Sequence, residues 1–143
     1  MKIVEIRKSD LDSLRKIFLE ERQTTFSWVD PATFHLHDFD TETEGEYILV
    51  AILDDITIGF ISIWMPDNFI HHLYVDKKYH GKGIGTQLLK AALRKTNFPV
   101  TLKCLENNIQ AVNFYKSKGF IEKGKGESKQ GTFIVFELVK NPE

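Results

Sequence analysis

Three glycines stand at alternate positions in the segment His80-Gly81-Lys82-Gly83-Ile84-Gly85-Thr86, between a strand-like run and a helical run. Closely spaced glycines let the backbone approach a ligand without interference from Cβ atoms. The free amides of a helix N-terminus would point at that ligand and favour an anion. A flexible turn with incidental glycines is the simpler alternative, but one turn does not need three glycines. The segment therefore predicts a strand, an anion-binding loop and a helix in succession.

The spacing of these glycines excludes two common phosphate-binding loops. A mononucleotide P-loop needs Gly, four residues and then Gly-Lys-Ser/Thr, and the dinucleotide fingerprint needs Gly-x-Gly-x-x-Gly. Thr86 stands where the dinucleotide pattern requires its third glycine. An ordinary nucleotide-binding protein is therefore not expected.

Hydrophobic periodicity divides the rest of the chain into an α/β pattern. Strands are expected at 2–7, 47–53, 56–65, 69–75, 100–105, 120–124 and 132–139, and helices at 9–23, 83–95 and 107–117. A polar loop over 125–131 would join the last two strands. The segment 24–46 is too aromatic for a disordered linker and too long for a simple connection, so we expect a partly helical insertion.

Length and charge limit the class of protein. A chain of 143 residues is close to the usual size of one domain, so we expect a single domain over 1–143. It has 19 Lys and Arg against 20 Asp and Glu, a net charge of -1. No basic field for a nucleic-acid partner is expected from this balance.

The number of cysteines and the length of the apolar runs indicate the cellular compartment. Cys104 is the only cysteine, so it cannot form an intramolecular disulfide, and Glu5 interrupts the start of the chain where a signal peptide would be apolar. The longest apolar run, 56–65, is too short to span a bilayer. We expect a cytoplasmic protein without a membrane partner.

Two motifs resemble those of the GNAT superfamily of acyl-CoA N-acetyltransferases. Its pyrophosphate loop reads Arg or Gln, two residues, Gly, one residue, then Gly or Ala, and here the pattern is His80-x-x-Gly83-x-Gly85. His80 replaces the usual Arg or Gln, whereas the backbone amides of the loop do not depend on that side chain. The segment 71–76 resembles the family's fourth strand, and 108–120 resembles its Asn-x-x-Ala…Phe-Tyr…Gly-Phe motif.

The resemblance implies an α/β GNAT fold, in which helices flank a mixed sheet of about seven strands with splayed fourth and fifth strands. In that gap the pantetheine arm of acetyl-CoA pairs with backbone groups, here those of Leu73 and Val75. Asn108 is either a helix cap or a side-chain partner for the cofactor's amide, and both roles could coexist. The implied cofactor-binding residues are Leu73, Val75, His80, Gly81, Lys82, Gly83, Ile84, Gly85, Thr86, Asn108 and Tyr115.

Tyr115 occupies the position of the family's usual general acid. Acyl transfer from a thioester to an amine needs a stabilised oxyanion and a protonated leaving sulfur. A phenol with a pKa of about 10 stays protonated at neutral pH and can donate to that sulfur. From periodicity alone, Tyr115 would be a half-buried helix aromatic.

His71 and His72 are candidates for the general base, because an alkyl amine is mostly protonated at pH 7 and histidine titrates in the useful range. Strand side chains alternate, so we expect the two to face opposite sides and at most one to reach the cleft. Either could instead be a surface or cross-strand histidine. Adjacent strand residues rarely share an ion, and no Cys or carboxylate cluster accompanies this pair, so no metal is expected.

The acceptor would lie against the segment 24–46. It combines large aromatics, of which Phe26, Trp28 and Phe34 are the expected substrate-binding residues, with six carboxylates. Aromatic faces and carboxylates both attract cations, which favours a cationic amine. The alternative is a solvated acidic loop pinned to the core by its aromatics.

These features predict an enzyme that transfers an acetyl group from acetyl-CoA to a primary amine of a small molecule or peptide, by direct attack on the thioester. A non-catalytic acyl-CoA-binding regulatory module of the same fold is the alternative. A homodimer is a possible assembly.

Overall fold

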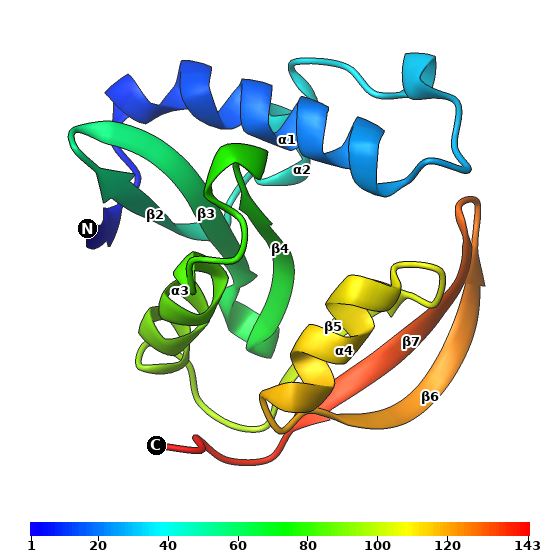
Figure 1. Ribbon diagram of the computed structural model, residues 1–143. Helices are drawn as coiled ribbons and strands as arrows, with labels where there is room; N and C mark the ends of the chain where they lie inside the picture. The colour runs from blue at the N-terminus through cyan, green and yellow to red at the C-terminus, as the bar shows by residue number, and fades with distance from the viewer.

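One mixed sheet of seven strands organises the chain, in the order β1-β2-β3-β4-β5-β7-β6. The computed structural model describes all of residues 1–143 (Figure 1). The strands are β1 (Lys2–Glu5), β2 (Tyr47–Leu53), β3 (Ile56–Trp64), β4 (Phe69–Val75), β5 (Val100–Leu105), β6 (Ile121–Ser128) and β7 (Gly131–Leu138). All neighbours are antiparallel except β4 and β5, which are parallel.

Helices cover both faces of this sheet (Figure 1). They are α1 (Leu11–Thr25), α2 (Asp38–Glu42), α3 (Ile84–Leu93) and α4 (Ile109–Ser117). Short 3-10 turns lie at Lys8–Asp10, Pro31–Thr33, Met65–Asp67 and Lys77–Tyr79. The helical content of the insertion, Pro31–Thr33 and α2, confirms that 24–46 is partly helical.

Strand β2 shows how the two helical layers share the sheet. Its sequence YILVAIL is apolar throughout because both of its faces are buried. Ile48, Val50 and Ile52 pack in the cluster that holds Phe18 of α1, whereas Leu49 and Ala51 pack in the larger cluster that holds α3. The period of two along the strand thus divides the core into an α1–α2 side and an α3–α4 side.

Arg22 fastens the 24–46 insertion to α1. It is 5% exposed, its guanidinium lies 3.8 Å from the centre of the Phe18 ring, and its Nε donates to Phe18 O at 2.8 Å. The remaining guanidinium N–H groups donate to Asp38 at 3.2 Å and Glu42 at 3.3 Å. Burying an unpaired charge is strongly destabilising, whereas the carboxylates and the carbonyl around Arg22 offset the cost of removing its guanidinium from water.

Strands β4 and β5 diverge soon after they begin. Only two residue pairs join them, Phe69 with Thr101 and Ile70 with Leu102. Beyond Ile70, β4 remains paired to β3 on its other edge as far as Val75. The predicted splay of the fourth and fifth strands is therefore confirmed.

The last hairpin is longer than predicted. The expected polar loop over 125–131 is wrong: β6 continues to Ser128, and only Lys129 and Gln130 separate it from β7. Because β6 is an edge strand that is exposed along almost its whole length, it needs no apolar alternation, and its pairing with β7 supplies the backbone hydrogen bonds.

Smaller differences lie at the helix ends. α1 continues two residues beyond 23, and α3 is shorter than 83–95. No helix in the structure combines the length and the apolar character needed to cross a bilayer.

The start of α1 depends on Asp10, which is 1% exposed. Its carboxylate accepts hydrogen bonds from Arg7 N at 2.8 Å, from the Arg7 guanidinium at 2.9 and 3.1 Å, and from Thr57 Oγ1 at 2.7 Å. Burial raises the pKa of Asp10, but the hydrogen bonds from Arg7 and Thr57 outweigh it and hold the pKa below its usual value. This carboxylate joins the segment that follows β1, the start of α1 and β3.

We expect Asp10→Ala to lower the free energy of unfolding by about 2 kcal/mol, because it leaves the donors of Arg7 and Thr57 unpaired. Asp12→Ala is the control, because the Asp12 side chain is 99% exposed and pairs only with Arg15. Urea unfolding measures both. The Asp10 contribution is present above its unfolded-state pKa of about 3.9 and is lost as pH falls through the lower folded-state pKa. An Asp10→Ala protein as stable as wild type at pH 7 would contradict this account.

Candidate active site

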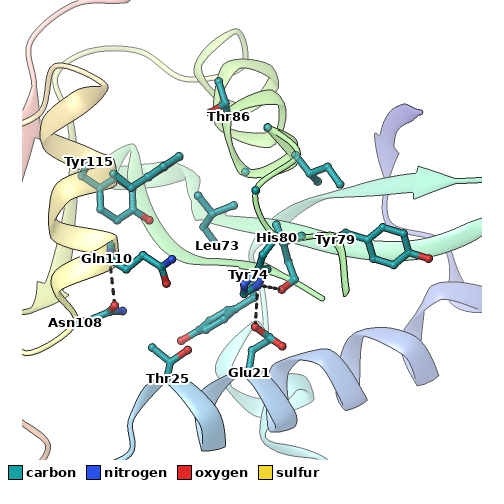
Figure 2. Close-up of a pocket in the computed structure, with 17 residues that line it drawn as sticks. Glu21, Thr25, Leu73, Tyr74, Tyr79, His80, Thr86, Asn108, Gln110 and Tyr115 are labelled. Carbon is teal, nitrogen blue, oxygen red and sulfur yellow. Dashed lines mark hydrogen bonds and ion pairs between the residues drawn. The ribbon is translucent and has the colours of Figure 1, made fainter. Parts of the chain in front are cut away.

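A cavity of about 440 Å³ opens where β4 and β5 diverge. Its walls come from α1, β4, the loop before α3, the first turn of α3, and α4 (Figure 2). The lining residues are Glu21, Thr25, Leu73, Tyr74, Val75, Tyr79, His80, Gly81, Gly83, Ile84, Gly85, Thr86, Asn108, Gln110, Ala111, Phe114 and Tyr115. Every predicted cofactor-binding residue except Lys82 is among them.

The glycine loop presents the N-terminus of α3 to this cavity. Gly81 and Gly83 have φ angles of 76° and 77°, a left-handed conformation that side chains with a Cβ rarely adopt. Gly83 is the N-cap of α3 and no side chain caps the helix. The first helical bond runs from Gln87 N to Gly83 O, so the amides of residues 84–86 lie ahead of it. These amides and the helix dipole suit a phosphate group.

The free edge of β4 forms another wall. Leu73 and Val75 pair with Ile61 and Gly59 of β3, and β5 has already turned away from β4 at this point. Apart from the Val75 carbonyl, which contacts His80 Nε2, backbone groups of β4 that would complete a parallel ladder are therefore available to a ligand in the cavity. This arrangement supports the expected main-chain role of Leu73 and Val75.

The His80 side chain contacts one group of β4 and one of α1. Its Nε2 lies 2.7 Å from Val75 O and 3.1 Å from Glu21 Oε1, and Figure 2 shows its ring between β4 and α1. The side chain thus ties the glycine loop to β4 and α1.

Glu21 was not predicted from the sequence. It is 7% exposed and accepts a hydrogen bond from Lys77 N at 3.2 Å in addition to its pair with His80. Burial raises the pKa of this carboxyl, and the charge interaction with His80 only partly offsets the effect. The sequence contains a pattern that could have identified Glu21. It continues the apolar stripe of Leu14 and Phe18 on α1, where a carboxylate is unexpected.

Tyr115 enters the cavity from α4, and Figure 2 shows its hydroxyl directed inward. The ring is 9% exposed and packs against Phe114, Phe120 and Phe136 at centroid distances of 5.2, 5.5 and 6.3 Å. Burial raises the pKa of Tyr115, so the phenol remains a proton donor throughout the physiological range.

Tyr74 is a second phenol in the same cavity. Its ring packs against Phe18 at 5.5 Å and Phe60 at 6.1 Å, and burial raises its pKa as well. The alternation that places Leu73 and Val75 toward α3 turns Tyr74 toward α1.

Asn108 caps α4. Its side-chain Oδ1 accepts a hydrogen bond from Ala111 N at 3.3 Å. The cap is therefore confirmed, and the position of Asn108 in the cavity wall leaves its contact with a cofactor amide as a prediction.

The prediction that His71 and His72 face opposite sides is wrong. Their rings stack with centroids 3.8 Å apart. The pairing with β3 shifts between Ser62 and Ile63, which face His72 and Ile70, so His71 is an extra residue without a partner. This β-bulge breaks the alternation along the strand.

Neither histidine lines the cavity. His72 packs against Phe18, 4.8 Å between centroids, and burial lowers its pKa to about 3. An imidazole this hard to protonate is a poor base for an ammonium group. His71 Nδ1 lies 2.7 Å from Glu46 Oε2. The two reasons against a metal also fail, because the bulge places both rings together and Glu42 accompanies them.

The aromatic residues expected to bind the acceptor gather beyond the C-terminal end of α1. Phe26 lies 5.5 Å from Trp28 and 6.2 Å from Phe34 between ring centroids. Trp28 Nε1 donates to Gln130 O at 2.7 Å, which links this cluster to the β6–β7 turn. The three residues do not line the cavity, so their substrate role stays a prediction.

Most carboxylates of the 24–46 segment are already paired. Asp38 and Glu42 bind Arg22, Asp40 binds Arg15, and Glu46 binds His71. These ion pairs favour the alternative in which 24–46 is a loop fixed to the rest of the protein, because few of its carboxylates are free to attract a cationic acceptor. Glu21 is the only carboxylate in the cavity wall.

Known proteins share both sequence and fold with this chain. A region of 80 residues is 38% identical to a peptidyl-lysine N-acetyltransferase, YjaB, of Salmonella typhimurium and covers 54% of this chain and 52% of that protein. A region of 77 residues is 30% identical to a spermine/spermidine N(1)-acetyltransferase of Bacillus subtilis and covers 49% of each. The match thus spans about half the length of these relatives.

Solved structures agree over nearly the whole chain. The apo form of YjaB from Escherichia coli superposes with a TM-score of 0.79 at 22% identity and covers 97% of both chains. The PaiA N-acetyltransferase of Thermoplasma acidophilum in complex with coenzyme A gives 0.76 at 21% identity, over 96% of this chain and 98% of that one. The sequence model of the acetyltransferase (GNAT) family matches residues 11–120. With the splayed strands, the glycine loop and this match over well more than half of its length, the chain belongs to the GNAT family of acetyltransferases.

Proposed function

We propose that this protein transfers the acetyl group of acetyl-CoA to a primary amine. The observation that carries the proposal is the cavity itself, which combines the uncapped N-terminus of α3, a free β4 edge and a protonated phenol. The cofactor's pyrophosphate suits the α3 amides, and its pantetheine amides suit the β4 backbone. The thioester would then lie between β4 and α4, within reach of Tyr115.

In the reaction the neutral amine attacks the thioester carbonyl. The attacking nitrogen becomes cationic as it bonds to the carbonyl carbon, and it loses a proton to a base in the cavity, which passes the proton to solvent. The tetrahedral intermediate then collapses as the carbon–sulfur bond breaks, and the leaving sulfur receives a proton from Tyr115. Because burial keeps Tyr115 protonated, the donor is present at the pH where the amine is partly neutral. Tyr115 is then reprotonated from solvent.

We assign Glu21 to the acceptor amine. It reaches the cavity from α1, on a different wall from Tyr115 of α4 (Figure 2). Its raised pKa makes it a better proton acceptor than an exposed carboxylate, and its charge favours an incoming ammonium. The relatives named for peptidyl-lysine and for spermine/spermidine support a cationic amine as the substrate class.

A non-catalytic acyl-CoA-binding module remains the second candidate. It would use the same α3 amides and β4 edge, but it would need neither Tyr115 nor Glu21. Thiol release from acetyl-CoA in the presence of spermidine or a lysine peptide separates the two, because only the enzyme releases thiol at a rate that depends on the amine.

The loop assignment predicts that Gly83→Val weakens acetyl-CoA binding more than tenfold. Valine is strained at a φ of 77°, so the amides of the loop leave their positions. Gly124→Val is the control, because Gly124 lies on β6 without a positive φ and with open space around its Cα. Calorimetric titration with acetyl-CoA measures both. Equal affinity in a folded Gly83→Val protein would exclude the loop as the pyrophosphate site.

For the acid, we expect Tyr115→Phe to lower kcat by about 100-fold while acetyl-CoA affinity changes little, since only the hydroxyl is removed. Tyr74→Phe is the matched variant, because it removes a second phenol of the same cavity. A larger loss of kcat in Tyr74→Phe than in Tyr115→Phe would transfer the acid role to Tyr74.

For the acceptor, we expect Glu21→Gln to lower kcat/KM for spermidine at least tenfold, with acetyl-CoA affinity within about twofold of wild type. Glu20→Gln is the control, because Glu20 is the exposed neighbour on the same helix. A steady-state series with spermidine, a lysine peptide and a neutral amine such as glycinamide at high pH measures the effect. An unchanged kcat/KM in Glu21→Gln would leave this residue with only its structural contacts to His80 and Lys77 N.

A further inference from the structure

The β-bulge in β4 gathers metal-ligating side chains outside the cavity. One donor atom from each of Glu42, His71 and His72 lies within 4.8 Å of the other two. Glu42 ends α2, and the two histidines belong to β4, so the cluster joins two elements that are distant in sequence. None of the three residues lines the active-site cavity.

Three buried polar atoms in this region have no hydrogen-bond partner. They are Nε2 of His72, Oε1 of Glu46 and Oγ of Ser62, which is the residue of β3 paired with His72. A buried imidazole nitrogen without a partner is uncommon in a well-packed protein, and an ion that is not yet bound is one established reason for it. This observation is independent of the spacing of the cluster.

The surroundings orient the ligands. Glu46, whose side chain is 6% exposed, holds His71 Nδ1 at 2.7 Å and so leaves Nε2 of that ring for a ligand. Histidines that bind metals commonly engage a carboxylate through their other ring nitrogen in this way. Arg22 lies 3.3 Å from one oxygen of Glu42, and the Glu42 side chain is 42% exposed, so its carboxylate is free to adjust.

Charge also favours a cation at this position. Asp38, Glu42 and Glu46 carry three negative charges, and Arg22 supplies one positive charge. A divalent ion would balance the two remaining negative charges.

We propose that Glu42, His71 and His72 bind a zinc ion, with Glu46 orienting His71. Two imidazoles and a carboxylate form a ligand set that zinc accepts in tetrahedral geometry, with the fourth position left to water. Calcium and magnesium prefer oxygen ligands alone. Tetrahedral donors lie about 3.4 Å apart, so the cluster must contract, and the exposed Glu42 side chain can move toward the histidines. An imidazole binds a metal in the plane of its ring, so the His71 ring, which is stacked on His72 and 37% exposed, must also turn toward the ion. The ion would fasten α2 to β4 and hold the 24–46 insertion on the sheet.

The test uses the full chain without an affinity tag, dialysed against a chelator. Titration with zinc chloride should give one ion per chain at micromolar affinity or tighter, and Co²⁺ should give the intense visible absorption of a tetrahedral site. Zinc should also raise the melting temperature, because the ion binds the folded chain. Neither readout depends on acetyl transfer, so failure of the proposed enzyme activity would not affect the result.

Glu42→Gln and His71→Gln should each weaken zinc binding at least tenfold. His37→Gln is the matched control, because His37 is an exposed histidine that begins α2 and pairs with Asp40. Circular dichroism checks that each variant folds. Absence of binding to the wild-type chain, or binding that Glu42→Gln and His71→Gln leave unchanged, would overturn the proposal.

Discussion

The short contact between β4 and β5 determines where a ligand can bind. Two parallel strands that paired along their whole length would satisfy each other's backbone groups and close the sheet. Here only Phe69 and Ile70 of β4 are paired with β5, and β3 keeps the rest of β4 in place. Hydrogen-bonding capacity is therefore left on a rigid strand, beside the N-terminus of α3. A thin, amide-rich molecule with an anionic end matches that combination.

Polar contacts of α1 connect this gap to the rest of the core. Glu21 accepts from Lys77 N and pairs with His80, and His80 also contacts Val75 O. The glycine loop is thus fixed to the helix that carries the proposed acceptor carboxylate. Because the same carboxylate positions the loop and faces the cavity, cofactor binding and acceptor binding share one structural element.

Sequence patterns predicted the parts of the site that depend on local backbone chemistry. Gly83 lies at a positive φ and Asn108 caps α4, and both requirements can be recognised within a few residues. Contacts between elements that are distant in sequence determined the other features of the site and of the sheet. A bulge opposite Ser62 and Ile63 placed His71 beside His72, and an exposed edge allowed β6 to run through polar residues. Glu21 was predicted only as part of a helix, because its burial depends on β4 and the glycine loop.

Acceptor selection depends on which carboxylates of the protein are already in ion pairs with its own arginines. Arg15 and Arg22 bind Asp38, Asp40 and Glu42, so these carboxylates hold the insertion to α1 and attract a distant cation only weakly. Glu21 differs because it lies in the cavity wall, largely shielded from water, where an ion pair is screened least. The charge of Glu21 would therefore select a cationic amine at its reacting nitrogen. The aromatic cluster of Phe26, Trp28 and Phe34 would contact the rest of the acceptor only where the acceptor is long enough to extend past α1.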